Sequence, residues 1–292
     1  MRILNTTAPH NLFGLEEQDY DTAKVAVLPV PYDSTSTYRV GSREGPHAII
    51  EASRALELYS EEFDAVISDK IGIFTLEELA PDYNSPEGTI NRIAKEVGLL
   101  LDDRKVPLLL GGEHTIAVGA VKAIAKNYKD GFSVLHLDAH ADSRDEFMST
   151  KYCHACVMAR IREMCKSTFS AGIRSIDKDS AHQYEKSILY MKDMKKMTTA
   201  QIVATILKNT KKNLYITLDL DVLDSAEFPS TGTPEPGGLR YDELREILKG
   251  VLKERNLIGI DFNEMNPIPG MVAPESMVAK LIYNTIGYAF LK

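Results

Sequence analysis

Short apolar runs rich in β-branched residues alternate along the whole chain with segments whose apolar residues recur every three or four positions. The first pattern predicts buried strands, and the second predicts helices with one apolar face. Together they indicate a mainly parallel sheet covered by helices on both faces, because such strands are buried on both sides. The predicted strands are residues 25–28, 106–110, 133–138, 168–173, 214–219 and 257–262.

Three stretches between these strands have clear helical spacing. Pro46 suits the first turn of a helix, and Thr198 suits a helix cap. Residues 263–274 are rich in Asn, Pro and Gly and are predicted to form an ordered loop. The spaced apolar positions are Ile49, Ala52, Leu56 and Tyr59; Ile90, Ile93, Val97 and Leu100; and Leu244, Ile247 and Val251. We expect one domain over residues 1–292, with an α/β fold of three layers, α/β/α.

Composition excludes several classes of partner. The chain has 34 basic and 42 acidic residues, a net charge of −8, and its basic residues are scattered. A surface for nucleic acid or for an acidic membrane is therefore not expected, and a cationic small molecule suits the balance better. The sequence contains neither an N-terminal apolar run nor a stretch long enough to span a bilayer. We expect a soluble cytoplasmic protein.

Three cysteines, Cys153, Cys156 and Cys165, are too few for a disulfide framework in a chain of 292 residues. Cys153 and Cys156 form a C-x-x-C. A redox motif of that kind is expected to open a helix directly after a strand, whereas this one lies in mid-chain around His154. We interpret the spacing as incidental.

Polar residues cluster where the predicted strands end. Asp138, His140 and Asp142 have a spacing of two, so they face one side if the strand stays extended. Asp219 and Asp221 repeat that spacing on another strand. His114 and Glu264 follow two further strands. Ligands of open α/β sheets bind at the carboxyl ends of the strands, so these groups are expected to meet.

The cluster predicts a centre with two metal ions. A lone Asp at a strand end usually caps a helix, but several strand ends carrying ligand groups together favour a metal site. Four carboxylates would repel one another without cations, and two divalent ions balance their charge. Oxygen-rich ligation with two imidazoles and no thiolate favours Mn²⁺. The candidate ligands are His114, Asp138, His140, Asp142, Asp219 and Asp221.

These motifs resemble those of the ureohydrolases, the arginase and agmatinase family. The run Gly111-Gly-Glu-His-Thr115 resembles G-G-[DE]-H-[ST], and Asp138-Ala-His-Ala-Asp142 resembles D-A-H-x-D. The run Thr217-Leu-Asp-Leu-Asp221, continuing from Pro229 to Gly238, resembles the third signature of the family. The segments 34–43 and 264–267 extend the resemblance over nearly the whole chain.

The resemblance implies a role for each matching residue. His114, Asp138, Asp142 and Asp219 would hold one manganese ion. His140, Asp138, Asp219 and Asp221 would hold the other, with Asp138 and Asp219 bridging. A metal-bridging hydroxide would attack the guanidinium carbon of the substrate.

Three further roles follow from the same resemblance. Asp142 would pass a proton to the leaving amine, Glu264 would bind the guanidinium, and His154 would shuttle protons. The resemblance also implies a homo-oligomer, commonly a trimer or a hexamer.

The expected substrate is agmatine, which would give urea and putrescine, the product that links the enzyme to polyamine biosynthesis. Arg144 stands roughly where arginases have Asn, so the arginase pattern is broken. Asp145, Glu146 and Asp177 are candidate partners for the substrate ammonium, and Arg144 is a further candidate substrate contact. Arginine, guanidinobutyrate and aminopropylagmatine remain alternatives. Two other classes also stay open, a single-zinc deacetylase-like enzyme and a family member without catalysis.

Overall fold

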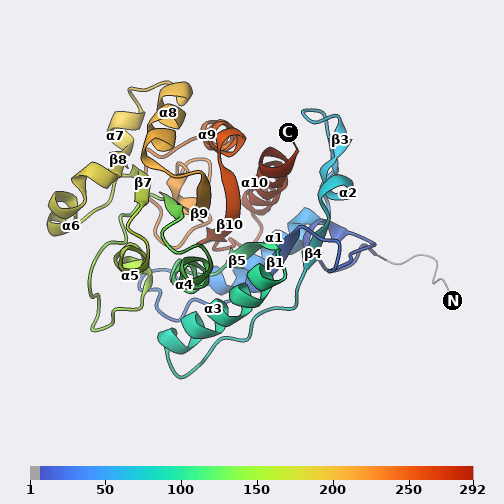
Figure 1. The fold of residues 1–292 in the computed structure, drawn as a ribbon, viewed down its shortest axis with the longest axis horizontal. Helices are drawn as coiled ribbons and strands as arrows, with labels where there is room; N and C mark the ends of the chain where they lie inside the picture. The colour runs from blue at the N-terminus through green and yellow to red at the C-terminus, as the bar shows by residue number, and fades with distance from the viewer. Residues whose placement is uncertain (1–6, 292) are drawn as a thin grey trace.

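Eight strands form one sheet at the centre of the protein, in the order β4-β1-β5-β10-β9-β6-β7-β8, and every neighbouring pair is parallel. The computed structural model describes residues 7–291. Helices cover both faces of the sheet, giving the predicted α/β/α architecture of one domain (Figure 1). The strands are β1 (Val25–Val30), β4 (Ile73–Thr75), β5 (Val106–Gly111), β6 (Phe132–Leu137), β7 (Thr168–Ile173), β8 (Ile188–Tyr190), β9 (Asn213–Asp219) and β10 (Asn256–Asn263).

The six predicted strands are confirmed to within two residues at each end, because their apolar runs are buried on both faces. The edge strands β4 and β8 escaped prediction. Each is three residues long with a partly exposed pattern, so neither produces a recognisable apolar run.

The helices form two layers, each with its own apolar core. One layer contains α3 (Pro86–Asp102), α4 (Ile116–Tyr128) and α5 (Val157–Met164). The other contains α1 (Gly45–Ser53), α8 (Thr199–Asn209), α9 (Tyr241–Glu254) and α10 (Ala273–Phe290). Shorter helices are α2 (Ile67–Ile71), α6 (Lys178–Gln183) and α7 (Met191–Met194). Because both sheet faces are covered, the strand ends are the expected place for a ligand site.

The predicted helix boundaries hold at two places and fail at two. Pro46 lies in the first turn of α1, and Thr198 caps α8 by accepting from Gln201 N at 3.3 Å. The helix predicted from Ile49 to Tyr59 is wrong beyond Ser53, whose hydroxyl donates to the carbonyl of Ile50 and ends the helix.

The chain then forms a small antiparallel pair, β2 (Tyr59–Ser60) and β3 (Ala65–Val66). The predicted loop 263–274 is also shorter than expected, because β10 includes Asn263 and α10 starts at Ala273. Pro274 belongs to the first turn of α10, a position that does not need its missing N–H.

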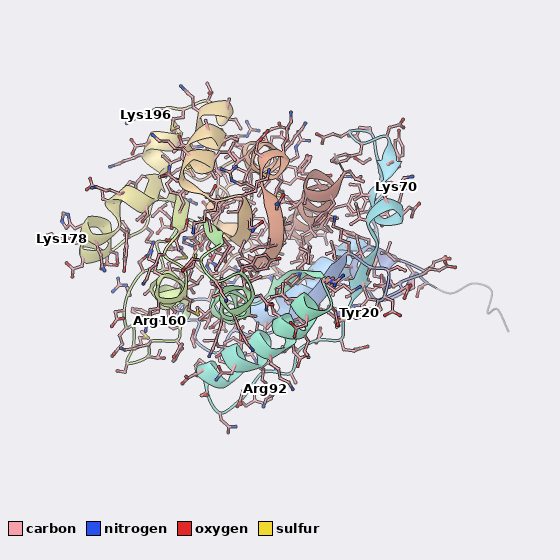
Figure 2. All side chains as sticks on the ribbon, viewed as in Figure 1. Tyr20, Lys70, Arg92, Arg160, Lys178 and Lys196 are labelled. Carbon is pink, nitrogen blue, oxygen red and sulfur yellow. The ribbon has the colours of Figure 1, made fainter. Side chains whose placement is uncertain are left out.

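Basic side chains are spread over separate elements of the surface (Figure 2). The labelled ones belong to α2, α3, α5, α6 and the segment after α7, and are Lys70, Arg92, Arg160, Lys178 and Lys196. This dispersal agrees with the scattered charge of the sequence. Within residues 7–291, none of the helices has the length and apolarity needed to cross a bilayer.

Candidate active site

The loop after β5 brings His114 close to the sheet edge because two glycines precede it. A Cβ on Gly112 would lie 2.1 Å from the carbonyl oxygen of Tyr32, and one on Gly111 would lie 2.0 Å from Asn263 Oδ1. Side chains at these positions would push the loop away. The two glycines therefore set the depth at which the His114 ring enters the site.

The orientation of the His114 ring is set by a buried hydrogen-bond chain. Thr217 Oγ1 donates to Asp261 Oδ1 at 2.7 Å, so its oxygen accepts from His114 Nε2, also at 2.7 Å. Tyr215 and Asn263 donate to the same Asp261 carboxylate. His114 Nε2 thus carries a hydrogen, and Nδ1 is the nitrogen that faces the site.

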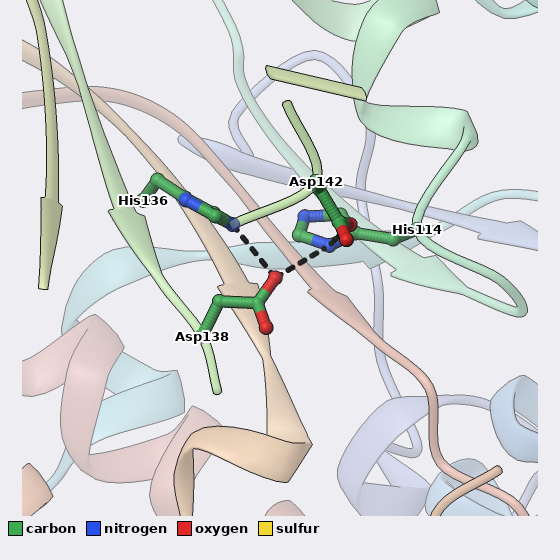
Figure 3. Close-up of side chains that lie close together, drawn as sticks. All are labelled: His114, His136, Asp138 and Asp142. Atoms are coloured by element: carbon green, nitrogen blue, oxygen red, sulfur yellow. Dashed lines mark hydrogen bonds and ion pairs between the residues drawn. The ribbon is translucent and has the colours of Figure 1, made fainter. Parts of the chain in front are cut away.

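Three carboxylates surround His114 Nδ1. The nitrogen lies 3.2 Å from Asp138 Oδ2, 3.3 Å from Asp142 Oδ2 and 3.3 Å from Asp219 Oδ2. Figure 3 shows Asp138 and Asp142 directed at the ring from different segments. All three distances exceed the roughly 2.7–2.9 Å of a charge-assisted hydrogen bond. Among the described residues, Nδ1 is a buried nitrogen without a hydrogen-bond partner.

This arrangement fits a cation. A lone pair on Nδ1 facing three carboxylate oxygens is repulsive unless a proton or a metal ion lies among them. Burial lowers the pKa of His114, but its contacts with the three carboxylates outweigh burial and raise that pKa well above its usual value. The structure thus brings together His114, Asp138, Asp142 and Asp219, the first predicted ligand group.

A second group of ligand atoms forms beside the first. His140 Nδ1 lies 2.7 Å from Asp221 Oδ2 and 3.8 Å from Asp138 Oδ1. Burial lowers the pKa of His140, but the charge of Asp221 and its hydrogen bond outweigh burial and raise it to about 11. Asp138, His140 and Asp221 together could hold a metal ion. Asp138 belongs to both groups, as a bridging carboxylate must.

The electrostatics of the carboxylates agree with a need for positive charge. Burial and the neighbouring Asp221 raise the pKa of Asp138 to about 6, and burial raises the pKa of Asp219 well above its usual value. Both groups therefore resist ionisation in the absence of a cation. Four carboxylates and two imidazoles fit two divalent ions, and this donor set contains no thiolate.

The path of the backbone differs from the one predicted. Strand β6 ends at Leu137, and the segment 138–142 is not an extended strand, because Asp142 has a φ of 46°. Asp221 lies in a short 3-10 helix (Leu220–Val222), and its N–H donates to Asp219 Oδ1 at 2.9 Å. The spacing of two would place these residues on one side only in an extended strand, and that condition is not met at Asp142 or at Asp221. The side chains converge because the loop and the 3-10 turn curl around the site.

His136 is a site residue that the sequence reasoning missed. It lies on β6 two positions before Asp138, and its Nε2 is 2.7 Å from Asp138 Oδ2 (Figure 3). Its Nδ1 is 3.0 Å from Ser170 Oγ. Burial lowers the pKa of His136 well below its usual value, so the ring is neutral. A neutral imidazole has one N–H that donates a hydrogen bond and one nitrogen that accepts. We interpret it as a group that orients the Asp138 carboxylate. The spacing His136-x-Asp138 was the available signal.

Glu264 lines the cavity beside the predicted ligands. Its N–H donates to Gly112 O at 2.7 Å, and its Oε1 accepts from His114 N, also at 2.7 Å. The residue has a φ of 65°, a strained value for a side chain of this size. Burial raises the pKa of Glu264 well above its usual value. A buried carboxyl of this kind gains from a cationic ligand, because the ligand stabilises its charged form.

His154 faces the cavity from the turn before α5. Its N–H donates to Thr35 Oγ1 at 3.2 Å, and its Nε2 is 3.4 Å from Thr37 Oγ1. Glu113 anchors that threonine segment from below, because it accepts from Thr35 N at 2.7 Å and from Thr35 Oγ1 at 2.5 Å. Glu113 and Thr35 were not predicted as site residues, although they lie inside the motifs that were singled out.

A cavity of about 250 Å³ opens above the predicted ligands. Its lining includes three of those ligands, His140, Asp142 and Asp219, and also Glu264, His154, Arg144, Phe147, Arg39 and Asp177. Asp177 contacts the cavity while its Oδ1 accepts from Ser180 N at 3.0 Å, as the cap of α6. Asp145 lies outside this lining. Its carboxylate pairs with Arg160 and, at 3.7 Å, with Lys151, and its side chain is 76% exposed.

Comparison with known proteins agrees with this geometry. The family model "Arginase family" matches residues 23–287. An N(1)-aminopropylagmatine ureohydrolase of Synechocystis is 33% identical over 92% of this chain and 90% of its own length. An agmatinase of Halalkalibacterium halodurans is 33% identical over 88% of each chain.

Solved structures support the same assignment. The agmatine ureohydrolase of Thermoplasma volcanium superposes with a TM-score of 0.85 at 29% identity, covering 93% of this chain and 92% of that one. The superposition extends over nearly the full length of both chains. The chain belongs to the arginase family and is a ureohydrolase.

Proposed function

We propose that the protein hydrolyses agmatine to urea and putrescine at a centre of two manganese ions. The observation that carries the proposal is the position of His114 Nδ1, 3.2–3.3 Å from three carboxylate oxygens, beside a cavity that also contains Glu264. Guanidinium is delocalised, cationic and a poor electrophile. Its hydrolysis needs a strong nucleophile and an anionic group that holds it, and the cavity offers groups for both.

Each metal would be held by side chains already gathered. His114, Asp138, Asp142 and Asp219 would hold one ion. His140, Asp138 and Asp221 would hold the other, together with Asp219, whose Oδ1 accepts from Asp221 N at 2.9 Å. When bound, the pair of ions supplies a nucleophile from water at neutral pH.

The remaining steps belong to residues of the chain. Glu264 binds the guanidinium at its NH groups, and burial makes this charge pairing strong. Asp142 carries a proton toward the leaving amine. His154 exchanges protons with solvent from the cavity wall, where Thr35 holds its backbone N–H and Thr37 lies beside its ring.

The far end of the substrate is proposed to be an amine. Asp177 lines the cavity and supplies a carboxylate for an ammonium group. Arg144 lies in the same wall, with its guanidinium 5.3 Å above the Phe147 ring. Asp145 is not included in the proposed substrate contacts, because Arg160 and Lys151 already neutralise it.

N-aminopropylagmatine is the second candidate substrate. The Synechocystis relative carries that name and matches most of both chains. A longer polyamine would leave its guanidino end at Glu264 and extend its second ammonium past Asp177. Arginine and guanidinobutyrate end in a carboxylate, which Arg144 and Arg39 would attract instead. The preference between a substrate that ends in an amine and one that ends in a carboxylate therefore depends on the balance between Asp177 and the two arginines.

The test is urea release by the manganese-loaded protein with agmatine, N-aminopropylagmatine, arginine and guanidinobutyrate measured in parallel. Asp219→Ala serves as the blank, and Glu264→Gln serves as a variant that keeps the metal ligands. We expect urea from agmatine, none from Asp219→Ala and strongly reduced urea from Glu264→Gln. A preference for N-aminopropylagmatine would move the assignment to the second candidate. Absence of urea with all four compounds would overturn the proposal.

We also propose a cytoplasmic homo-oligomer, a trimer or a hexamer. Light scattering coupled to gel filtration tests the subunit number, and a molar mass of one chain would contradict it.

A further inference from the structure

Cys153 and Cys156 flank His154 in a single turn. The 3-10 helix η3 (His154–Cys156) follows Cys153 directly and leads into α5, so the pair does open a helix. Their sulfur atoms lie 3.3 Å apart, and both residues are buried. A redox motif of this kind is expected to open a helix directly after a strand. The pair meets the first of these expectations but not the second, because a long loop separates it from β6.

The two thiols differ in acidity in the way that a reactive pair requires. The hydrogen bond with Cys156 lowers the pKa of Cys153, whereas the same contact and burial raise the pKa of Cys156. Cys153 is therefore the sulfur that ionises first, and its thiolate is the nucleophile. Cys165 has different surroundings. It lies 3.4 Å from the carbonyl oxygen of Ser167, and burial raises its pKa.

The turn that holds the pair also holds two cavity residues. His154 lies between the cysteines and is fixed by its N–H to Thr35 Oγ1 at 3.2 Å. The carbonyl of Ala155 accepts from Arg144 N, also at 3.2 Å. A change in the conformation of this turn would therefore move His154 and, through the Ala155 carbonyl, the segment that carries Arg144. Because His154 and Ala155 line the cavity, a small oxidant that enters the cavity arrives beside the cysteine pair.

We propose that Cys153 and Cys156 form a reversible disulfide, and that closing it lowers urea release by moving the turn that carries His154. A disulfide needs the sulfurs at about 2.05 Å, so closure draws them together by more than about 1 Å from their present distance. A displacement of that size near reacting groups can lower turnover by about 10²-fold. The effect on turnover rests on the proposed function, whereas formation of the bond does not.

The oxidant is a peroxide, and the reaction balances in two steps. The Cys153 thiolate attacks one peroxide oxygen, an S–O bond forms, the O–O bond breaks, and hydroxide leaves and takes a proton. The Cys156 sulfur then attacks the Cys153 sulfenic acid. The S–S bond forms, the S–O bond breaks, and the released hydroxide takes the Cys156 proton to become water. The two sulfurs lose two electrons, which reduce the peroxide.

The test treats the manganese-loaded protein with dilute hydrogen peroxide and then with dithiothreitol. Free thiols are counted, intact mass is measured, and urea release is followed on the same samples. We expect the thiol count to fall from three to one with a mass lower by two hydrogens, and urea release to fall by about tenfold or more. Dithiothreitol should restore all three values.

Three variants make the result specific. Cys165→Ser should behave as the wild type does, with thiols falling from two to none. Cys153→Ser and Cys156→Ser should each keep their urea release under the same peroxide. Absence of a disulfide in the wild type would overturn the proposal, and so would a disulfide that leaves turnover unchanged. Equal loss of activity in Cys153→Ser would assign the loss to other oxidation and overturn it as well. A protein that forms the disulfide with peroxide, but releases no urea even in its reduced state, would contradict the proposed function and not the formation of the bond.

Discussion

Thr217→Val tests whether the hydrogen-bond chain beneath His114 prepares the site for metal. The hydroxyl of Thr217 accepts from His114 Nε2 and donates to Asp261, each at 2.7 Å, and the residue is fully buried. Valine keeps the shape but removes both contacts. The His114 ring then loses the partner that holds its hydrogen on Nε2, and the alternative tautomer places a hydrogen where a metal must bind.

The magnitude follows from two effects. Loss of a group that orients a metal ligand typically lowers affinity by about 10–100-fold, which is roughly 1.4–2.8 kcal/mol. Leaving His114 Nε2 buried without a partner lowers the free energy of unfolding of the metal-free protein by about 1–3 kcal/mol. Thr217→Ser is the matched control, because it keeps the hydroxyl and loses one methyl, at a cost of about 1 kcal/mol in stability.

The assay titrates metal-stripped protein with Mn²⁺ against a competing chelator, and denaturant unfolding of the stripped protein reports the stability change. We expect weak binding by Thr217→Val and affinity within about threefold of the wild type for Thr217→Ser. Equal affinity of Thr217→Val and the wild type would refute the claim that this chain orients His114. Equal weakening in both variants would assign the loss to packing instead.

Four further predictions concern charge and backbone. Because carboxylates raise the pKa of His114 well above its usual value and that of His140 to about 11, the metal-free protein holds protons there at neutral pH. Metal binding should release them, so affinity should rise about tenfold per pH unit for each proton displaced, as calorimetry in buffers of different ionisation enthalpy would show. Glu264→Gln should lower kcat/KM for agmatine by about 10²-fold or more, roughly 3 kcal/mol, with metal content unchanged. Gly112→Ala should destabilise the fold by about 3 kcal/mol or more in denaturant unfolding, because its Cβ would meet a carbonyl at 2.1 Å. Gly98→Ala, in an open position on α3, should instead stabilise by about 1 kcal/mol.

Protonation of His140 also affects the free energy of unfolding of the metal-free protein. The folded pKa of His140 lies above its unfolded value, so the protonated imidazole stabilises the metal-free protein below about pH 6.5. That contribution is lost as pH rises through the folded pKa of about 11.

Metal affinity that is independent of pH would contradict the account of the cluster. Loss of metal from Glu264→Gln would show that this residue supports the ligands instead.

The sequence predicted the sheet well because its central strands are buried on both faces and are therefore apolar throughout. The edge strands β4 and β8 lack that pattern, since partly exposed positions interrupt each three-residue strand. The end of α1 was missed for a different reason. Leu56 and Tyr59 keep the helical spacing, but the hydroxyl of Ser53 bonds back to the helix and stops it.

The candidate site was predicted in composition but not in conformation. The positive φ of Asp142 and the 3-10 turn at Asp221 are not readable from a polar run, because Asp adopts several backbone states at strand ends. His136 Nε2 lies 2.7 Å from Asp138 Oδ2, but in the sequence a histidine inside an apolar strand resembles a core residue. Asp145 was predicted from its charge alone, and its ion pair with Arg160 depends on the folded structure.

Metal content measured together with turnover tests the central claim most directly. Protein stripped with a chelator and reconstituted with Mn²⁺ is analysed for metal per chain while urea release from agmatine is followed. The account predicts that urea release is absent without metal and reaches its maximum at two manganese ions per chain. A protein that retains one zinc ion per chain and releases no urea at any manganese loading would contradict it.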